Sequence, residues 1–208
     1  LEYGKDPVIH RVDLVRSVAK VSNDSVTVSF IGAGSFAQTY LIPAVKTQKD
    51  VALTCVVTRT GGNARKLAEK HGFASCATDA DEVLGDEKTD VVFIATRHDT
   101  HASLTTHALR AGKHVFVEKP LALVPEELVD MEEAYRQGST VLQVGFNRRF
   151  AALTTWAMAE LSSRDGPTCL IYRVNAGMIP ADHWIRSEEG GGRILGEFCH
   201  FIDFAQHV

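Results

Sequence analysis

Short apolar, β-branched runs alternate with helix-like segments along most of this chain, and no other feature constrains its fold as strongly. The intervals are typical of βαβ units, in which a helix connects two parallel strands. The runs are almost continuously apolar, which favours strands covered by helices on both faces. The pattern therefore predicts an α/β fold with a doubly wound parallel sheet. The expected strands span residues 26–31, 51–58, 73–76, 91–95, 114–117 and 141–144, and the expected helices span 36–47, 64–71, 80–84, 101–110 and 126–137.

The composition of the 208 residues is that of an ordinary globular protein, with 45% hydrophobic residues and a formal net charge of -4. Lysine and arginine are scattered through the chain, so nucleic acid and acidic membranes are not expected as partners. No apolar run reaches the roughly 18 residues that a membrane span requires. The four cysteines are far apart and lack CxxC spacing, which favours reduced thiols in a cytoplasmic protein.

Three regions are expected along the chain. Residues 1–24 are mixed and charged, with a short amphipathic stretch around Val12, Val15, Val18 and Val21, and are interpreted as a linker or arm. Residues 25–145 carry the alternating pattern. Residues 146–208 predict a partial α/β domain, with helices over about 150–162 and 193–207 and a half-exposed strand over 168–175.

The first expected strand ends in a G-x-G-x-x-A turn that leads into a helix. A dinucleotide's pyrophosphate needs close approach to the backbone at a helix N-terminus, where free N–H groups favour negative charge. Gly32 permits the tight turn, Gly34 leaves room for phosphate, and Ala37 allows close packing of helix on strand. Because the turn joins a strand to a helix, the sequence predicts a dinucleotide site that includes Ser35 and Phe36.

The second expected strand ends in Thr58 and Arg59, where an NAD-binding site usually has an acidic residue for the ribose hydroxyl. An arginine at this place can pair with a 2′-phosphate. NAD(P) is therefore the predicted cofactor, with NADP slightly favoured over NAD.

Two further strand ends meet the glycine turn at the same edge of a parallel sheet. The fourth strand ends in Ala95 and Thr96, with His101 shortly after, and the fifth strand ends in Glu118-Lys119-Pro120. A partly desolvated Lys119 beside a cofactor can donate a hydrogen bond to a substrate oxygen whose charge changes. The alternative is a surface lysine paired with Glu118.

Together these three motifs resemble the Gfo/Idh/MocA oxidoreductase family, over about residues 26–203. The resemblance implies a nicotinamide-binding Rossmann domain followed by an α/β domain with a large sheet, acting on sugars, cyclitols or related alcohols. It places Lys119 beside nicotinamide and substrate, and Ala95, Thr96, His101 and Glu118 at the cofactor. It also implies that the chain is a fragment, and that the full-length protein is a homo-oligomer. Arg97 departs from the family, which commonly has proline there.

The stretch after Gly190-Gly191-Gly192 resembles the family's entry to its catalytic helix, which makes His200 the expected proton donor or acceptor. The family often has aspartate four residues earlier, where this chain has Gly196. Glu197 lies on the same helical face as His200 and is expected to orient it. Glu197, His200 and Asp203 also allow a metal-ligand interpretation, but no second Glu-x-x-His is present and no metal is expected. A buried, hydrogen-bonded core histidine is the other alternative.

Two more stretches, 145–150 and 174–184, resemble family segments that line the cleft between domains. They make Arg149, Asn175, His183 and Trp184 candidates for substrate contact, with Arg149 also a candidate for a structural role. With residues 190–203 they look most like the second half of bacterial two-part proteins, which fuse a zinc alcohol-dehydrogenase-like domain to a Gfo/Idh/MocA domain.

The sequence thus predicts an NAD(P)-dependent oxidoreductase that moves hydride between nicotinamide and an alcohol carbon of a sugar, cyclitol or nucleotide sugar. Lys119 would polarise the substrate oxygen, His200 would exchange the proton, and Glu197 would tune His200. The alternatives are a non-catalytic dinucleotide-binding module with a regulatory or scaffold role and, ranked last, a metal-dependent hydrolase that uses Glu197.

Overall fold

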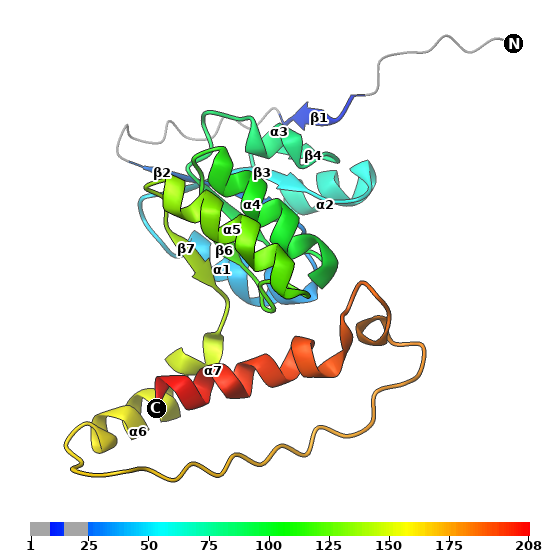
Figure 1. Cartoon of the computed structure of the whole chain (residues 1–208). Coiled ribbons are helices and arrows are strands. Elements are labelled where there is room, and N and C mark those ends of the chain that lie inside the picture. Colours follow the sequence, from blue (N-terminus) through cyan, green and yellow to red (C-terminus); the bar gives the residue numbers. More distant parts are fainter. Residues whose placement is uncertain (1–8, 15–24) are drawn as a thin grey trace, which may run out of the picture.

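A seven-stranded sheet forms the centre of the protein (Figure 1). The computed structural model describes residues 9–14 and 25–208. Strand order is β1-β4-β3-β2-β5-β6-β7, and only β1 is antiparallel to its neighbour within the described sheet. The chain reverses its direction of winding between β2 and β5, which is the switch point of a Rossmann sheet. The strands are β1 (Arg11–Asp13), β2 (Val26–Ile31), β3 (Val51–Val57), β4 (Ser75–Ala77), β5 (Val91–Ile94), β6 (His114–Val117) and β7 (Leu142–Val144).

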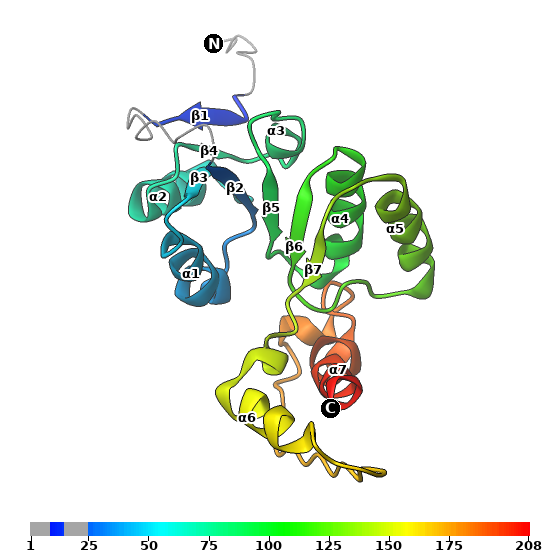
Figure 2. The same cartoon turned by 90° about the vertical axis from the view of Figure 1, so that its left-hand side faces the viewer.

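Helices cover both faces of this sheet, as the apolar strands require. One layer contains η1 (Ala37–Leu41), α1 (Ile42–Lys46) and α2 (Gly61–His71), and the other contains α3 (Asp81–Leu84), α4 (His101–Arg110) and α5 (Pro125–Gln137). Figure 2 shows α1 and α2 on one side of the strands and α4 and α5 on the other. The doubly wound Rossmann prediction is therefore confirmed, with element bounds within about three residues of those expected.

Two apolar clusters, one on each face, hold these layers together. Phe30 on β2 is fully buried, stacks on Phe93 of β5 with ring centres 4.7 Å apart, and meets Phe73 edge to face with ring centres 5.8 Å apart. Phe93 in turn stacks on Phe116 of β6 at 4.8 Å. This row of rings crosses the switch point, so packing aligns the strand ends that carry the sequence motifs.

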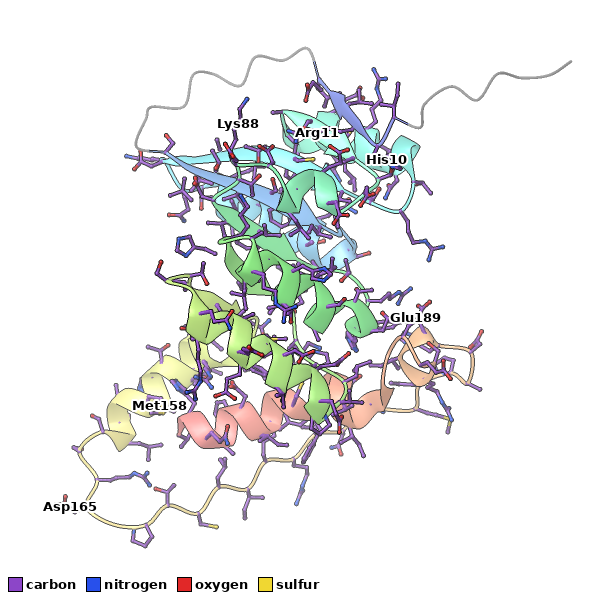
Figure 3. All side chains as sticks on the ribbon, turned by 45° about the horizontal axis from the view of Figure 1, so that its top comes forward. His10, Arg11, Lys88, Met158, Asp165 and Glu189 are labelled. Atoms are coloured by element: carbon purple, nitrogen blue, oxygen red, sulfur yellow. The ribbon has the colours of Figure 1, made fainter. Side chains whose placement is uncertain are left out.

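The strand β1 adds an edge to the sheet from within the segment expected to be a linker or arm. Arg11 donates a hydrogen bond to Asp86 Oδ2 at 2.8 Å and another to the Glu82 carbonyl at 3.1 Å, which ties β1 to α3 (Figure 3). Val12 lies on this strand, whereas Val15, Val18 and Val21 fall outside the described residues.

The chain after Gly145 forms helices and irregular segments below the sheet in Figure 1. The helical elements are η3 (Asn147–Phe150), α6 (Ala152–Leu161), η4 (Trp184–Arg186), η5 (Ile194–Phe198) and α7 (Cys199–His207). The strand expected over residues 168–175 is wrong, because these residues form no strand in the structure. A lone strand leaves its backbone groups unpaired, and alternation alone does not supply a partner.

All four cysteines lie among the described residues, and each is a free thiol. Within the described part of the chain, no helix combines the length and the apolar character needed to cross a membrane.

Candidate active site

The glycine turn lies directly against the end of β5. Gly32 has φ of +82°, and a Cβ there would lie 2.5 Å from the Ala95 carbonyl oxygen and 2.8 Å from Thr96 Cγ2. A side chain at this position is excluded both by strain and by space. The first two sequence motifs therefore meet at the switch point, where a Rossmann sheet binds its ligand.

The rest of the turn has the space and packing that a dinucleotide needs. A Cβ on Gly34 would have no atom within 4 Å, so the backbone there is open to close approach. Ala37 is buried at the start of η1, while Ser35 and Phe36 are exposed beside it. An open glycine backbone at the start of a helical segment fits a pyrophosphate.

A hydrogen bond from His101 connects the loop after β5 to the third motif, Glu118-Lys119-Pro120. This side chain is 1% exposed, and its Nδ1–H donates a hydrogen bond of 2.8 Å to the Pro120 carbonyl. Burial lowers the pKa of His101, which keeps the ring neutral and its bond directional. The Lys119–Pro120 peptide bond is cis. His101 thus holds the turn after β6 in register with the loop after β5.

Glu118 lies beside β7 rather than in an ion pair with Lys119. A Cβ on Gly145 would approach Glu118 Oε1 to 2.9 Å, so glycine at 145 makes room for the carboxyl group. Burial raises the pKa of Glu118. Within the described chain no ion pair joins Glu118 to Lys119, so the alternative of a simple surface pair is not what the structure has.

Lys119 instead reaches the helix that carries His200. Its Nζ donates a hydrogen bond of 2.7 Å to the carbonyl of Gly196, in the π-helical turn η5. π-Helical turns shift backbone carbonyls out of the regular pattern and recur at functional sites. A backbone oxygen of Gly196 therefore takes the lysine's hydrogen bond at the position where the family resemblance suggests an acid.

Gly196 is held by a cluster of side chains from the loop after β5 and from η4. A Cβ on Gly196 would lie 2.8 Å from Ile185 Cδ1 and 3.0 Å from His98 Cε1. His98 is 7% exposed, donates from Nδ1 to the Gly190 carbonyl at 2.8 Å, and contacts the Trp184 ring at 4.8 Å. Arg97 stacks its guanidinium 4.1 Å from the Trp184 ring centre.

The same cluster also contacts Glu189, at the start of the glycine-rich stretch 190–192. Arg97 Nε lies 3.7 Å from Glu189 Oε2, and the Asp99 N–H donates to the Glu189 carbonyl at 3.2 Å. Figure 3 shows Glu189 at the opposite end of the C-terminal region from Met158 and Asp165. Arg97, the departure from the family pattern, therefore anchors residues 183–190 to the Rossmann sheet.

His200 lies one helical turn beyond Gly196. Its pKa is lowered to about 4, first by burial and then by the positive charges of Lys119 and Arg148. Its ring is 6.1 Å from the Phe146 ring, and its Nδ1 is buried without a hydrogen-bond partner among the described residues. The lowered pKa keeps the imidazole in its neutral form at neutral pH, which is the form a general base needs, and also makes it a weaker base than an ordinary histidine.

The two acids on this helix, Glu197 and Asp203, are paired with arginines rather than with His200. Glu197 Oε2 accepts a hydrogen bond of 2.9 Å from Arg193, and Asp203 forms a two-point ion pair with Arg149. No hydrogen bond joins Glu197 to His200 within the described chain, although the Glu197 charge raises the pKa of His200. No group of three or more His, Cys, Asp or Glu side chains suited to a metal ion occurs among the described residues.

The remaining predicted residues lie in three places. Trp184 lies in the cluster beside the site, and His183 is exposed next to it, accepting a hydrogen bond from the Ile185 N–H at 3.3 Å. Asn175 is exposed in the irregular segment 168–178. Thr58 is buried at the end of β3, and Arg59 beside it is exposed.

Of the two roles expected for Arg149, substrate contact or structure, its contacts match the structural one. Arg149 is the structural residue, since its guanidinium fastens η3 to the buried Asp203 of α7. Arg148, which sequence reasoning left out, remains exposed near His200. Nothing in two adjacent arginines indicates which one pairs inward. His98 was likewise missed, although it directly follows a predicted strand end.

Comparisons with known proteins agree with this geometry. A family model described as Gfo/Idh/MocA, an oxidoreductase family with an NAD-binding Rossmann fold, matches residues 26–146. D-glucoside 3-dehydrogenase of Escherichia coli is 31% identical over 195 residues, which cover 90% of this chain and 55% of that protein. The scyllo-inositol 2-dehydrogenase (NAD(+)) of Bacillus subtilis is 34% identical over 186 residues, which cover 88% of this chain and 54% of that protein.

A solved structure extends the likeness to three dimensions. GenD2 from gentamicin A biosynthesis, crystallised in complex with NAD, is 26% identical, has a TM-score of 0.63, and is matched over 73% of this chain and 42% of that one. The chain spans about half the length of the curated relatives it matches.

The contacts around Gly196 predict that restoring an acid there is harmful. In Gly196→Asp the side chain meets Ile185 and His98, so we expect a loss of about 1–3 kcal/mol in the free energy of unfolding, measured by urea denaturation. Gly62→Ala on α2, where a Cβ has open space, is the control and should be neutral or stabilising. Unchanged stability of Gly196→Asp would contradict the packing described.

The buried His98 predicts a pH dependence of stability. Its pKa is lowered to about 4 in the folded state, first by burial, so protons bind the unfolded chain first as the pH falls. His98 should therefore cost nothing above about pH 6.5 and reduce stability by up to about 3 kcal/mol as the pH falls toward 4. His98→Gln should flatten the unfolding free energy over this window, and the exposed control His107→Gln should not.

Proposed function

Since the chain belongs to the Gfo/Idh/MocA oxidoreductase family, whose fold is an NAD-binding Rossmann fold, we propose that it serves NAD(P)-dependent hydride transfer at an alcohol carbon of a sugar, cyclitol or nucleotide sugar. The observation that carries the proposal is the hydrogen bond between Lys119 and the carbonyl of Gly196. It sets an amine from the sheet edge beside the helix of His200, next to the glycine turn.

The cofactor would be held by the glycine turn and the adjoining strand ends. The supporting features are the open backbone at Gly34 and the close contact of Gly32 with Ala95 and Thr96. The residues proposed to hold it are Gly32, Gly34, Ser35, Phe36, Ala37, Thr58, Arg59, Ala95, Thr96, Glu118 and Lys119. When bound, a nicotinamide supplies a carbon that accepts or donates hydride. His101 supports this region from behind, because it is buried under the Pro120 carbonyl.

Lys119 and His200 would carry out the two remaining steps, stabilisation of the substrate oxygen and transfer of its proton. The Lys119 ammonium would donate to the substrate oxygen and stabilise charge that develops there. His200, neutral because of its lowered pKa, would accept the hydroxyl proton during oxidation and return it during reduction. Glu197 would tune His200 through its charge rather than through a hydrogen bond, since its carboxylate is paired with Arg193.

NADP is the proposed preference over NAD. The end of β3 has Thr58 and Arg59 where an acidic residue would hold the NAD ribose. Thr58 Oγ1 donates to the Thr60 carbonyl at 3.0 Å, which shapes the turn and leaves the Arg59 side chain exposed. An exposed guanidinium without a neighbouring acid in this turn suits a 2′-phosphate.

The complete protein is proposed to be a cytoplasmic homo-oligomer, with a fusion to an upstream alcohol-dehydrogenase-like domain. Exposed apolar side chains support further protein contacts. They are Phe150, Leu153, Trp156, Ile171, Met178, Ile194 and Ile202. The fusion rests on the resemblance of residues 145–150, 174–184 and 190–203 alone.

Lys119→Ala tests the catalytic assignment. We expect kcat to fall by a factor of about 10²–10⁴ in steady-state assays over a panel of sugars, sugar alcohols and nucleotide sugars, a larger effect than any rise in the Kd for NADPH. The control Lys46→Ala removes an exposed lysine on α1 and should keep wild-type kinetics. Full turnover in Lys119→Ala would contradict the assignment, and cofactor binding without hydride transfer to any substrate would favour a non-catalytic binding module.

Arg59→Ala tests the cofactor preference. Loss of a charge-assisted contact to the 2′-phosphate should raise the Kd for NADPH by a factor of about 10–100 and leave that for NADH unchanged, as measured by fluorescence titration. Arg110→Ala, an exposed arginine at the end of α4, should change neither affinity. Equal affinities of the wild type for NADPH and NADH would contradict the proposed preference for NADP.

A further inference from the structure

Two cations beside His200 have only neutral partners. Lys119 Nζ donates to the Gly196 carbonyl at 2.7 Å, and Arg148 Nη1 donates to the Tyr172 hydroxyl at 3.2 Å. The Arg148 guanidinium also lies 4.9 Å from the centre of the Phe201 ring. Neither side chain has a carboxylate within 4.0 Å among the described residues.

The nearby acids are already occupied. Glu197 is paired with Arg193, Asp203 with Arg149 and Glu189 with Arg97. Glu118, the neighbour of Lys119, is turned toward Gly145, and its burial disfavours the charged form. The protein therefore balances the other arginines here and leaves Lys119 and Arg148 without direct counterions.

These two cations flank one stretch of helix from two directions. Lys119 comes from the end of β6 and contacts Gly196, one turn before His200. Arg148 comes from η3 and stacks on Phe201, the residue after His200. Phe146, two residues before Arg148, brings its ring to 6.1 Å from that of His200. The charges of both cations lower the pKa of His200, after the larger effect of burial, which places them within electrostatic reach of the same ring.

Building on the function proposed above, we propose that the substrate is an anionic sugar derivative, with a carboxylate or phosphate group that Arg148 receives while Lys119 contacts the reacting oxygen. A guanidinium has five N–H donors in a planar fork, and Arg148 uses one of them on a neutral hydroxyl. The others match the geometry of a carboxylate or phosphate. Burial raises the pKa of Glu118 and the Lys119 charge lowers it, whereas Arg148 has no carboxylate within 4.0 Å among the described residues, so a bound anion would supply its direct counter-charge.

The anion belongs to the substrate rather than to the cofactor, because the cofactor's phosphates have their own place at the glycine turn. That turn follows β2, whereas Arg148 follows β7 and lies three strands away in the sheet order. Removing Arg148 should therefore leave cofactor affinity unchanged.

Equilibrium binding tests the proposal without requiring turnover. The NADPH-loaded chain is titrated in a calorimeter with D-glucose, D-glucuronate and D-glucose 6-phosphate, and with D-galactose and D-galacturonate. We expect at least one acid to bind about tenfold or more tightly than its neutral counterpart, as for hydrogen bonds to charged groups. A preference for the uronates or for the sugar phosphate identifies which anion the site receives.

Substitutions of Arg148 test whether this side chain is responsible for the tighter binding of acids. Arg148→Gln should reduce the ratio of acid to neutral affinity to about one, Arg148→Lys should retain part of it, and Arg110→Gln, which removes the same charge from α4, should leave it unchanged. The Kd for NADPH and the far-ultraviolet circular dichroism spectrum should stay the same in all three.

Equal affinity for acids and neutral sugars, an acid preference that survives in Arg148→Gln, or saturable binding of neither class would overturn the proposal. Hydride transfer is measured separately on the same panel. Turnover of neutral sugars alone would overturn the anionic substrate class and leave the oxidoreductase assignment standing. Anion binding at Arg148 with no hydride transfer to any substrate would instead contradict that assignment.

Discussion

The hydrogen bond from Lys119 to the carbonyl of Gly196 joins the two parts of the molecule that the chemistry needs together. Lys119 is placed by β6 and by the turn that His101 fastens from behind, while Gly196 belongs to the helix of His200. A backbone carbonyl is a fixed acceptor, so the amine is positioned as accurately as the helix itself. The helix is positioned in turn by Arg149 and Asp203 and by the cluster around His98.

This interaction also sets the charge of the site. A carboxylate at position 196 would neutralise Lys119, whereas a carbonyl holds it and leaves its charge uncompensated. Burial and the two neighbouring cations then keep His200 neutral. A lysine that can donate a proton and a neutral imidazole that can accept one therefore lie on the same stretch of helix, within electrostatic reach of each other. The free positive charge is what makes an anionic substrate favourable.

The sequence predicted the Rossmann part of the structure well, because local and non-local signals agree there. The run 26–31 is apolar enough to be buried on both faces, and Gly32 is required by φ and by contact with Ala95. Residues 168–175 alternate equally well but form no strand, since alternation does not supply a partner. The choice between Arg148 and Arg149 depends on which one reaches Asp203, a contact 54 residues away in the chain that no local pattern encodes. Glu197 is a different case, because Arg193, four residues earlier on its own helix, takes the carboxylate that spacing assigned to His200, and this local pair competes with the other.

The two departures from the family pattern, Arg97 and Gly196, are connected by contacts rather than independent. Arg97 stacks on Trp184 and reaches Glu189, which holds η4 against the loop after β5. That arrangement brings Ile185 and His98 within 3.0 Å of where a Cβ on residue 196 would be, so a larger residue there has to displace these side chains. With glycine at 196, the Lys119 amine donates to the backbone carbonyl of that residue. A single arginine in place of proline is thus linked, through packing, to the surroundings of Gly196 and so to the acceptor of the Lys119 amine.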